Sequence, residues 1–316
     1  MKKLTYLYVM LLLISLCGCE KNTEQTRFVL DTVAKITADC DEETLSGAFS
    51  LCEEYENLLS RTVNSSDVYR LNSASDFVEV SDSTAEIIDR ALFYSELSGG
   101  KFDITVCSVS ELWDFKNQII PNRNEIAEAL KNVDYESIET GKNKVNLNGK
   151  KIDLGAIAKG YIADRIKEYL IENGTEKAII NLGGNIVAFG EEYKIGIQKP
   201  FSGDNAAILC IENMSVVTSG IYQRYIEENG KIYHHIIDPT TGYGVENELA
   251  SVTVIGKSSL ECDALSTVCM LLGTEKGMEI IENTPATEAV FISREGSITL
   301  TEGIIQKKGM LYLNLK

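Results

Sequence analysis

Apolar residues recur at three- and four-residue intervals in several parts of this chain, a spacing that places them on one face of a helix. Glycines at Gly99, Gly100 and Gly174 follow such stretches, and we expect helices to stop there. The predicted helices cover residues 44–61, 84–98, 123–132, 156–172, 258–272 and 274–283.

Short runs rich in β-branched and aromatic residues predict strands elsewhere, often joined by turn sequences such as those at 228–230 and 294–296. Many hairpins imply antiparallel pairing. Helices concentrate in the first half and strands in the second, which favours an α+β fold of mostly antiparallel sheets with flanking helices. The predicted strands cover residues 145–148, 177–182, 185–189, 194–198, 206–212, 231–237, 249–255, 288–293, 297–301 and 310–315.

The first residues of the chain have the pattern of an export signal. Lysines precede an apolar run from Leu4 to Leu16 that is too short to span a bilayer as a stable anchor. The run closes on Leu-Cys-Gly-Cys, the pattern of a bacterial lipobox in which Cys19 carries the lipid. We expect a lipoprotein signal peptide at 1–18, a lipidated tether at 19–26 and a single domain at 27–316. An ordinary secretory signal or a buried strand is the alternative.

The net charge of the chain limits the kinds of molecule that we expect it to bind. The 316-residue chain has a formal net charge of −17, and loss of a lysine-bearing leader makes it more acidic still. This balance disfavours binding to nucleic acid, so no nucleic-acid partner is expected. An acidic protein that handles an anionic ligand needs local cations, which a metal, a lysine or a helix N-terminus can supply.

The cysteines do not form a recognisable site. None of those beyond Cys19 form a C-x-x-C pair, and none have zinc spacing with the histidines. Export would permit disulfides, but a core of this size does not require them. We interpret most of these cysteines as small buried residues, with any connectivity left open.

The segment KIDLGAIAKG, residues 151–160, is the strongest candidate for chemistry. Asp153 is predicted at a strand end, and Lys159 lies near the start of the helix that follows. Free N–H groups in the first turn of a helix bind phosphate well, and small residues allow a close approach. The lysine lies between Gly155 and Gly160 rather than after them, which excludes a Walker A loop.

A second candidate lies on the predicted helix 258–272. Asp263 and Thr267 are four residues apart, so both project from one face, with Ser266 beside them. Hard oxygen ligands of this kind suit Mg²⁺, which takes few carboxylates and keeps waters and substrate phosphates. The alternative is that Asp263 caps the helix N-terminus.

Both histidines lie in the segment YHHIIDPTTG, residues 233–242. Strand alternation places His234 and His235 on opposite faces, so at most one points into a given site. A histidine beside a turn is a candidate general base because its pKa lies near working pH. An exposed or core-satisfied pair is the alternative.

Two further segments have weaker signals. The sequence GGKFDIT at 99–105 leads to Trp113 and neighbouring aromatic residues, which could hold a flat ring but are more often core. The sequence NLGGN at 181–185 does not match the dinucleotide-binding fingerprint, so a Rossmann site is not indicated.

Taken together and in order, these motifs resemble the ApbE family of bacterial FAD:protein FMN transferases. The resemblance runs from about residue 27 to about residue 300. It rests on the lipobox and on LSR at 59–61 through YRLN at 69–72, GGKFDITV at 99–106, KIDLGAIAKG at 151–160, NLGGN at 181–185, VTSG at 217–220, HHIIDPTTG at 234–242 and DALST at 263–267.

The resemblance implies an ApbE-like (T-fold-like) architecture with a flavin cleft between two subdomains. FAD is then the substrate, Mg²⁺ lies on its pyrophosphate, and FMN passes to a threonine hydroxyl of an exported acceptor flavoprotein with release of AMP. His235 matches the candidate catalytic residue. The implied metal ligands are Ala156, through its carbonyl, Asp263, Ser266 and Thr267. The implied FAD contacts are Leu30, Lys101, Phe102, Asp103, Asp153, Lys159 and Ile237.

The implied location is the extracytoplasmic face of the cell membrane, through a lipid on Cys19. Family acceptors present a Ser/Thr-Gly-Ala-Thr-like target, and the nearest stretch here, Ser46 to Phe49, lacks the final hydroxyl, so self-flavinylation is not predicted. Two rival functions remain open: Mg²⁺-dependent hydrolysis of FAD to FMN and AMP, and flavin binding without catalysis.

Overall fold

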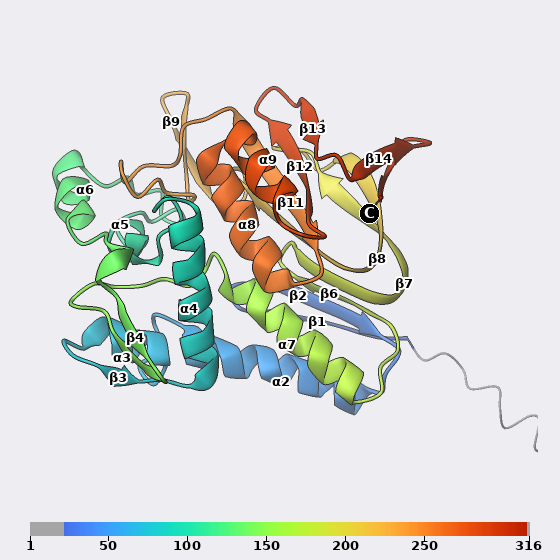
Figure 1. Cartoon of the computed structure of the whole chain (residues 1–316), viewed down its shortest axis with the longest axis horizontal. Coiled ribbons are helices and arrows are strands. Elements are labelled where there is room, and N and C mark those ends of the chain that lie inside the picture. Colours follow the sequence, from blue (N-terminus) through green and yellow to red (C-terminus); the bar gives the residue numbers. More distant parts are fainter. Residues whose placement is uncertain (1–21, 315–316) are drawn as a thin grey trace, which may run out of the picture.

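The computed structural model describes residues 22–314, so the predicted signal peptide and lipidation site lie outside the described residues. A 10-stranded sheet runs in the order β1-β2-β6-β7-β8-β11-β12-β13, with the β14–β15 hairpin attached at β8 (Figure 1). Among the described pairings of this sheet, only that of β15 with β8 is parallel. Its strands are β1 (Thr23–Val29), β2 (Thr32–Ala38), β6 (Ala178–Leu182), β7 (Asn185–Gln198), β8 (Asn205–Gly220), β11 (Leu249–Gly256), β12 (Glu288–Ser293), β13 (Ile298–Leu300), β14 (Ile304–Lys307) and β15 (Met310–Leu313).

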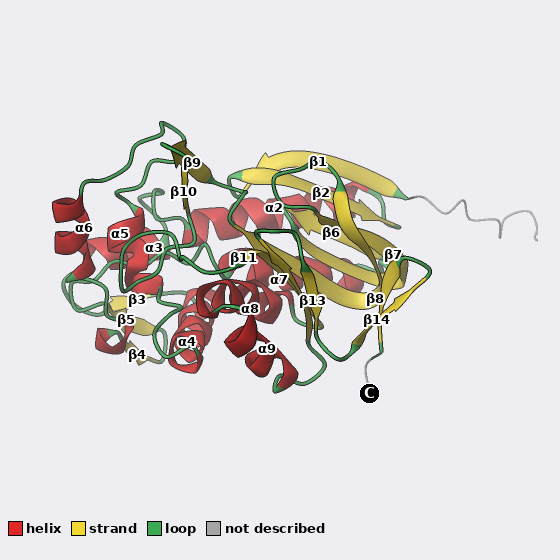
Figure 2. Cartoon of the chain, turned by 90° about the horizontal axis from the view of Figure 1, so that it is seen from above, coloured by secondary structure: helices red, strands yellow, loops and turns green. Residues whose placement is uncertain are grey.

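Helices cover one face of this sheet and continue into a lobe beside it (Figure 2). Two smaller sheets belong to that lobe: β3 (Val78–Glu79), β5 (Lys144–Asn146) and β4 (Glu139–Gly141), and the hairpin of β9 (Tyr225–Glu228) with β10 (Lys231–His234). The helices are α2 (Glu42–Leu59), α3 (Asp67–Ser73), α4 (Asp82–Leu97), η1 (Ile104–Val106), α5 (Cys107–Ser110), α6 (Arg123–Leu130), η2 (Tyr135–Ser137), α7 (Ala158–Glu172), α8 (Ser259–Leu272) and α9 (Thr274–Glu282).

The main core lies between the sheet and helices α2, α4, α7 and α8. It includes Ile36, Phe49, Ile162 and Val252, which are fully buried. Apolar side chains at helical spacing on α7 face inward, as the sequence pattern predicts. Burial of this apolar face is the main force that fixes α7 and α8 on the sheet.

The opposite face of the sheet is covered by the long β7–β8 hairpin. Its outer half carries Ile195, Ile197 and Leu209, which pack with Val216 and Ile255 in a second core cluster. The register of β7 against β8 shifts between Ala188 and Glu192, a bulge of the kind that bends a strand. The hairpin therefore folds back over the sheet from which it starts.

A third, smaller core supports the lobe formed by α5, α6 and the β9–β10 hairpin. Trp113 is 6% exposed, and its ring stacks on Phe115 and contacts Tyr233 and Tyr243. The indole nitrogen donates to the carbonyl of Gly242 at 3.1 Å. Trp113 is therefore a core residue, the more common role of such an aromatic cluster.

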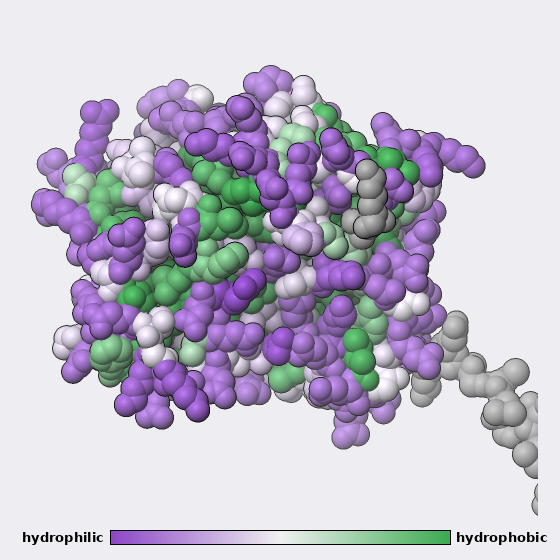
Figure 3. Space-filling model, in the orientation of Figure 1, coloured by the Kyte–Doolittle hydropathy of each residue, from purple (hydrophilic) through white to green (hydrophobic). Residues whose placement is uncertain are grey.

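The face of the molecule seen in Figure 3 is largely polar, but apolar side chains gather on it beside α4, α8 and α9. A pocket there is lined in part by Phe93, Leu97, Leu272 and Ile280. No helix in residues 22–314 is long and apolar enough to cross a membrane.

The predicted fold class is confirmed: the chain combines helices with a mostly antiparallel sheet. Each predicted helix is present, and Gly99, Gly100 and Gly174 follow helix ends with positive φ. The six cysteines described are free, and all but Cys40 are buried. Several elements were not predicted: the β1–β2 hairpin and the helix α3, whose polar and apolar residues alternate only weakly, and short elements, namely α5, η1, η2, β3, β4, β9 and β14.

Candidate functional site

The segment before α7 differs from the prediction in one respect. Asp153 does not end a strand, because β5 stops at Asn146 and residues 151–154 pair with no strand of the described chain. Asn72 holds the segment extended instead: its side chain donates to the carbonyl of Ile152 and accepts from the same residue's N–H, at 2.9 and 2.8 Å. A side-chain amide thus replaces the neighbouring strand, which periodicity alone cannot reveal.

The Asp153 carboxylate organises the turn that leads into α7. One oxygen accepts from the Gly155 N–H at 2.8 Å, and the other lies 3.6 Å from Nε of Arg61. Helix α7 then begins at Ala158 without a side-chain cap, since Ile157 occupies the capping position. The Ala158 N–H donates to the Leu154 carbonyl at 2.8 Å and the Gly160 N–H donates to Asp263, so the start of α7 favours an anion mainly through its helix dipole.

Helices α7 and α8 cross at their N-terminal ends, where Gly160 faces Asp263. The Gly160 N–H donates to Oδ2 of Asp263 at 2.9 Å. A β-carbon at Gly160 would lie 2.3 Å from the carbonyl oxygen of Ser259 and 2.7 Å from Cβ of Asp263. Glycine is therefore required here by the close approach of the two helices.

The interpretation of Asp263 as a helix cap is wrong. Ser258 is the N-cap of α8 and accepts from the Glu261 N–H. Asp164 of α7 also binds this end, accepting from the N–H groups of Ser259 and Leu260 at 2.9 and 3.0 Å. Because the first turn is already satisfied, Asp263 is free for another role.

Asp263 is a buried carboxylate, 4% exposed, with little charge compensation. Burial raises its pKa, and the nearby Lys159 ammonium and the Gly160 N–H only partly oppose this. The side chain of Asn185 also favours the ionised form. A bound cation would stabilise the ionised form of a carboxylate that is buried with so little charge compensation.

Two hydroxyl side chains, Ser266 and Thr267, follow Asp263 on α8. Ser266 Oγ lies 2.7 Å from Ser219 Oγ, which lies 3.2 Å from Oγ1 of Thr267. Ser219 is on β8 and reaches across to both residues. The Ser266 and Thr267 hydroxyls of α8 are thus held by a hydroxyl of β8, while Ala156 lies in the turn before α7.

His235 follows directly after β10. Its Nδ1 lies 3.2 Å from the carbonyl oxygen of Arg224, which also accepts from the backbone N–H of His235. Burial, together with the charge of Arg224, lowers the pKa of His235 to about 3. Lys159 acts on the same imidazole in the same direction, so Lys159 links His235 to Asp263 electrostatically.

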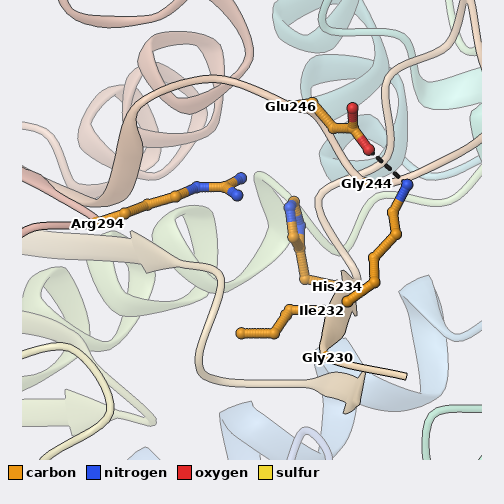
Figure 4. A pocket seen from close by; sticks show the side chains of 7 residues that line it. Gly230, Ile232, His234, Gly244, Glu246 and Arg294 are labelled. Atoms are coloured by element: carbon orange, nitrogen blue, oxygen red, sulfur yellow. Dashed lines mark ion pairs between the residues drawn. The ribbon is translucent and has the colours of Figure 1, made fainter. Parts of the chain in front are cut away.

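His234 points the other way, as strand alternation predicts, and lines a separate pocket of about 380 Å³ (Figure 4). It is 2% exposed, its Nε2 lies 3.1 Å from the Val245 carbonyl, and burial lowers its pKa to about 4. Arg294 points toward this imidazole from one side. On the other side Lys231 pairs with Glu246 at 2.7 Å. His234 is therefore the buried member of the pair, although its Nδ1 has no hydrogen-bond partner among residues 22–314.

Lys101, in the GGKFDIT segment, contacts the turn that follows His235. Its Nζ lies 3.0 Å from both carboxylate oxygens of Asp238 and 3.3 Å from Oγ1 of Thr240. Although burial opposes ionisation, hydrogen bonds from Thr240 and the charge of Lys101 hold the pKa of Asp238 below its usual value. This contact joins two segments far apart in sequence at the turn after His235.

The remaining predicted contacts differ in exposure. Phe102 is 2% exposed, and Asp103 accepts from the N–H and hydroxyl of Thr105 at 2.7 and 2.6 Å. Burial raises the pKa of Asp103. Ile237 is 6% exposed beside the Trp113 core. Leu30 lies in the β1–β2 turn with a φ of 56°.

Three participants could not be assigned a role from the sequence: Ser219, Asn185 and Gly160. Each lies inside a recognisable motif, but nothing in the motif shows which residue it will meet. Ser219 meets α8 across the sheet, and Asn185 accepts from the Ser259 hydroxyl. Only the tertiary crossing brings these segments together.

The described residues contain no group of three or more His, Cys, Asp or Glu side chains that could hold a metal. A site here would use one carboxylate with hydroxyl and carbonyl oxygens, which fits the sparse coordination that Mg²⁺ accepts beside phosphates. An uncapped helix start, a lysine and a neutral histidine complete a site suited to a phosphate-bearing anion.

Comparisons with known proteins agree with this description. The ApbE family model matches residues 30–291. A FAD:protein FMN transferase of Klebsiella pneumoniae (strain 342) is 38% identical over 271 residues, covering 83% of this chain and 85% of the relative. One from Treponema pallidum (strain Nichols) is 32% identical, covering 84% and 82%.

Solved structures show the same fold. The ApbE protein of Thermotoga maritima superimposes with a TM-score of 0.82 at 30% identity, over 89% of this chain and 97% of that one. The flavinyl transferase ApbE of Pseudomonas stutzeri, in its apo form, gives a TM-score of 0.79 at 27% identity, over 90% and 96%.

Fold and site together define a protein of helices on a mostly antiparallel sheet, with an oxygen-lined site for a phosphate-bearing ligand. The chain belongs to the ApbE family.

Proposed function

We propose that this protein transfers FMN from FAD to a threonine hydroxyl of an exported acceptor flavoprotein and releases AMP. The observation that carries the proposal is the 2.9 Å hydrogen bond from the Gly160 N–H to Asp263, which holds the first turn of α7, with Lys159, against a buried carboxylate. A cation and a helix N-terminus beside a carboxylate ligand support binding of a metal together with a phosphate-bearing substrate. The relatives' shared description as FAD:protein FMN transferases supports the same reaction.

Asp263, Ser266, Thr267 and the carbonyl of Ala156 would hold Mg²⁺. The metal, when bound, neutralises charge on the pyrophosphate. Lys159 adds a positive charge at the start of α7, where the helix N-terminus also favours an anion. Its Nζ now donates to the carbonyl of Gly155 at 3.1 Å, so it already lies over the turn.

His235 is proposed to accept the hydroxyl proton of the incoming threonine. Its lowered pKa keeps the imidazole neutral at physiological pH. Because Nδ1 faces the Arg224 carbonyl, an acceptor, that nitrogen carries the hydrogen and Nε2 keeps its lone pair. The tautomer therefore leaves Nε2 as the basic atom.

We propose further that Cys19 carries a lipid and holds the enzyme at the extracytoplasmic face of the cell membrane. The leader pattern supports this, as does the start of β1 at Thr23, which leaves only a short tether. Labelling with a lipid precursor tests it, with Cys19→Ala as the comparison that should lose the label and leave the membrane fraction.

The test of the reaction uses residues 20–316 with FAD, Mg²⁺ and an acceptor domain that bears the target threonine. Intact mass should show covalent FMN on the acceptor. AMP release without any change in acceptor mass would instead indicate FAD hydrolysis, and FAD binding with no AMP would indicate a carrier.

A further inference from the structure

The tip of the β7–β8 hairpin carries an unusual turn. The Ser202 N–H donates to the Lys199 carbonyl at 3.1 Å, and between them Pro200 is followed by Phe201 with a φ of 56°. A turn of this form places glycine or asparagine at the position of Phe201, since side chains avoid positive φ. For a bulky aromatic residue this backbone conformation is strained.

The aromatic side chain of Phe201 is not needed to shape the loop. The Lys199 N–H donates to the Asp204 carbonyl at 2.9 Å, and Gln198 donates to the Ser202 carbonyl at 2.8 Å. These hydrogen bonds close the loop whichever side chain stands at 201. Retained strain of this kind is typical of functional positions.

The Phe201 ring belongs to an exposed aromatic patch, which we define as Phe201, Tyr222 and Tyr225. Its centroid lies 5.9 Å from that of Tyr222 and 5.5 Å from that of Tyr225, both edge-on. Phe201 is 48% exposed and Tyr225 is 36% exposed. The folded-back hairpin therefore brings a solvent-facing ring to the β9 strand.

The aromatic patch adjoins the proposed catalytic histidine. Tyr225 pairs with His234 across the β9–β10 hairpin, and the carbonyl of its neighbour Arg224 lies 3.2 Å from Nδ1 of His235. The exposed Arg224 guanidinium makes no ion pair or hydrogen bond with any residue in 22–314. An unpaired cation thus lies next to the patch on an otherwise acidic protein.

We propose that the aromatic patch is the docking surface for the acceptor flavoprotein, which would place an apolar side chain on Phe201 and a carboxylate toward Arg224. The inference rests on the proposed function: an acceptor whose threonine reaches His235 must cover the residues around it. Aromatic residues and arginine are the residue types that dominate binding energy in protein interfaces.

The test is Phe201→Asn, because asparagine tolerates the left-handed backbone and removes the ring. Binding of the acceptor domain to the FAD-loaded enzyme should weaken by about tenfold or more, as expected for an interface hot spot. FAD affinity should not change, and the melting temperature should stay the same or rise because the strain is relieved. Phe201→Gly is a second variant with the same expectation.

Phe77→Asn is the matched control. Phe77 is 47% exposed and precedes β3, which lies at the other end of the lobe from β9 (Figure 1). This variant should bind the acceptor like the unaltered enzyme.

The outcomes separate the two proposals. If the unaltered enzyme flavinylates the acceptor and Phe201→Asn binds it equally well, the docking inference is overturned alone. If the unaltered enzyme neither binds nor flavinylates the acceptor, both proposals fail. Acceptor binding that depends on Phe201, with AMP released but no covalent FMN, would support docking and overturn the transfer reaction.

Discussion

The backbone N–H of Gly160 donates to the carboxylate of Asp263 at 2.9 Å and joins the first turn of α7 to the second turn of α8. One contact therefore fixes the distance between the proposed phosphate-binding turn and the proposed metal ligand. It depends on the absence of a side chain at 160, because a β-carbon would overlap α8.

Gly160→Ala should lower both stability and activity. The added methyl group would meet backbone atoms of Ser259 and Leu260 at 2.3 and 2.7 Å, so the helices must separate. Overpacking of this kind costs about 1–3 kcal/mol in the free energy of unfolding, which urea denaturation measures. Gly141→Ala is the control, since its nearest neighbour would lie at 3.8 Å and no loss is expected.

Asp263→Asn should separate stability from metal binding. Burial raises the pKa of Asp263, so the ionised carboxylate opposes folding at pH 7 and a neutral amide removes that cost. The melting temperature without metal should stay the same or rise, and its increase on adding Mg²⁺ should disappear. We expect AMP formation to fall at least ~100-fold, beyond the effect of outer-shell changes. A variant that kept the Mg²⁺-dependent shift would rule out this ligand.

Ser219→Ala should weaken Mg²⁺ binding by about 10–100-fold because Ser219 orients the hydroxyls of Ser266 and Thr267. Titration of the melting temperature with Mg²⁺ measures this effect. Ser215→Ala is the control on the same strand. The buried Ser215 hydroxyl has no hydrogen-bond partner in the described part of the chain, so its removal should be neutral or stabilising. Equal behaviour of the two variants would contradict a positioning role for Ser219.

Stability should fall as pH falls below about 6.5, the value for unfolded histidine. His234 and His235 have folded pKa values of about 4 and about 3, so the unfolded chain binds protons that the folded chain does not. Stability from these groups is complete above the unfolded pKa and is lost as pH decreases toward the folded values. At pH values well below the unfolded pKa, the free energy of unfolding should fall by about 1.4 kcal/mol per pH unit for each histidine.

Urea denaturation between pH 7.5 and 5 measures how the free energy of unfolding depends on pH. His234→Gln should remove the contribution of one of the two histidines to this dependence. Catalysis over the same range should show no loss from protonation of His235, because its imidazole stays neutral. An activity loss centred near pH 6.5 that vanished in a His235 variant would show that burial does not depress this pKa.

The sequence predicts the helices well because α7 and α8 each carry an apolar face of helical period and end at glycine or asparagine. It also predicts that His234 and His235 face opposite sides, since alternation in a strand is local geometry. The prediction that Asp153 ends a strand is wrong. Asn72, far away in the chain, makes with Ile152 the hydrogen bonds that a neighbouring strand would have made.

The partners of Asp263 could not be predicted for a related reason. Whether an aspartate caps its own helix depends on competition with other groups, here Ser258 and Asp164. The contacts among Gly160, Asp263 and Ser219 need three elements to be packed first. Motif recognition identifies such residues together but not which atoms meet.

The central claim is transfer of FMN to a threonine, with AMP as the other product. The most direct measurement follows covalent FMN on the acceptor and free AMP in the same reaction, with an acceptor Thr→Val variant and an enzyme His235→Gln variant alongside. If FMN passes to the threonine, one AMP should appear for each FMN attached, and neither the Thr→Val acceptor nor the His235→Gln enzyme should give covalent FMN. AMP produced equally with the Thr→Val acceptor, with no covalent FMN on either acceptor, would contradict it.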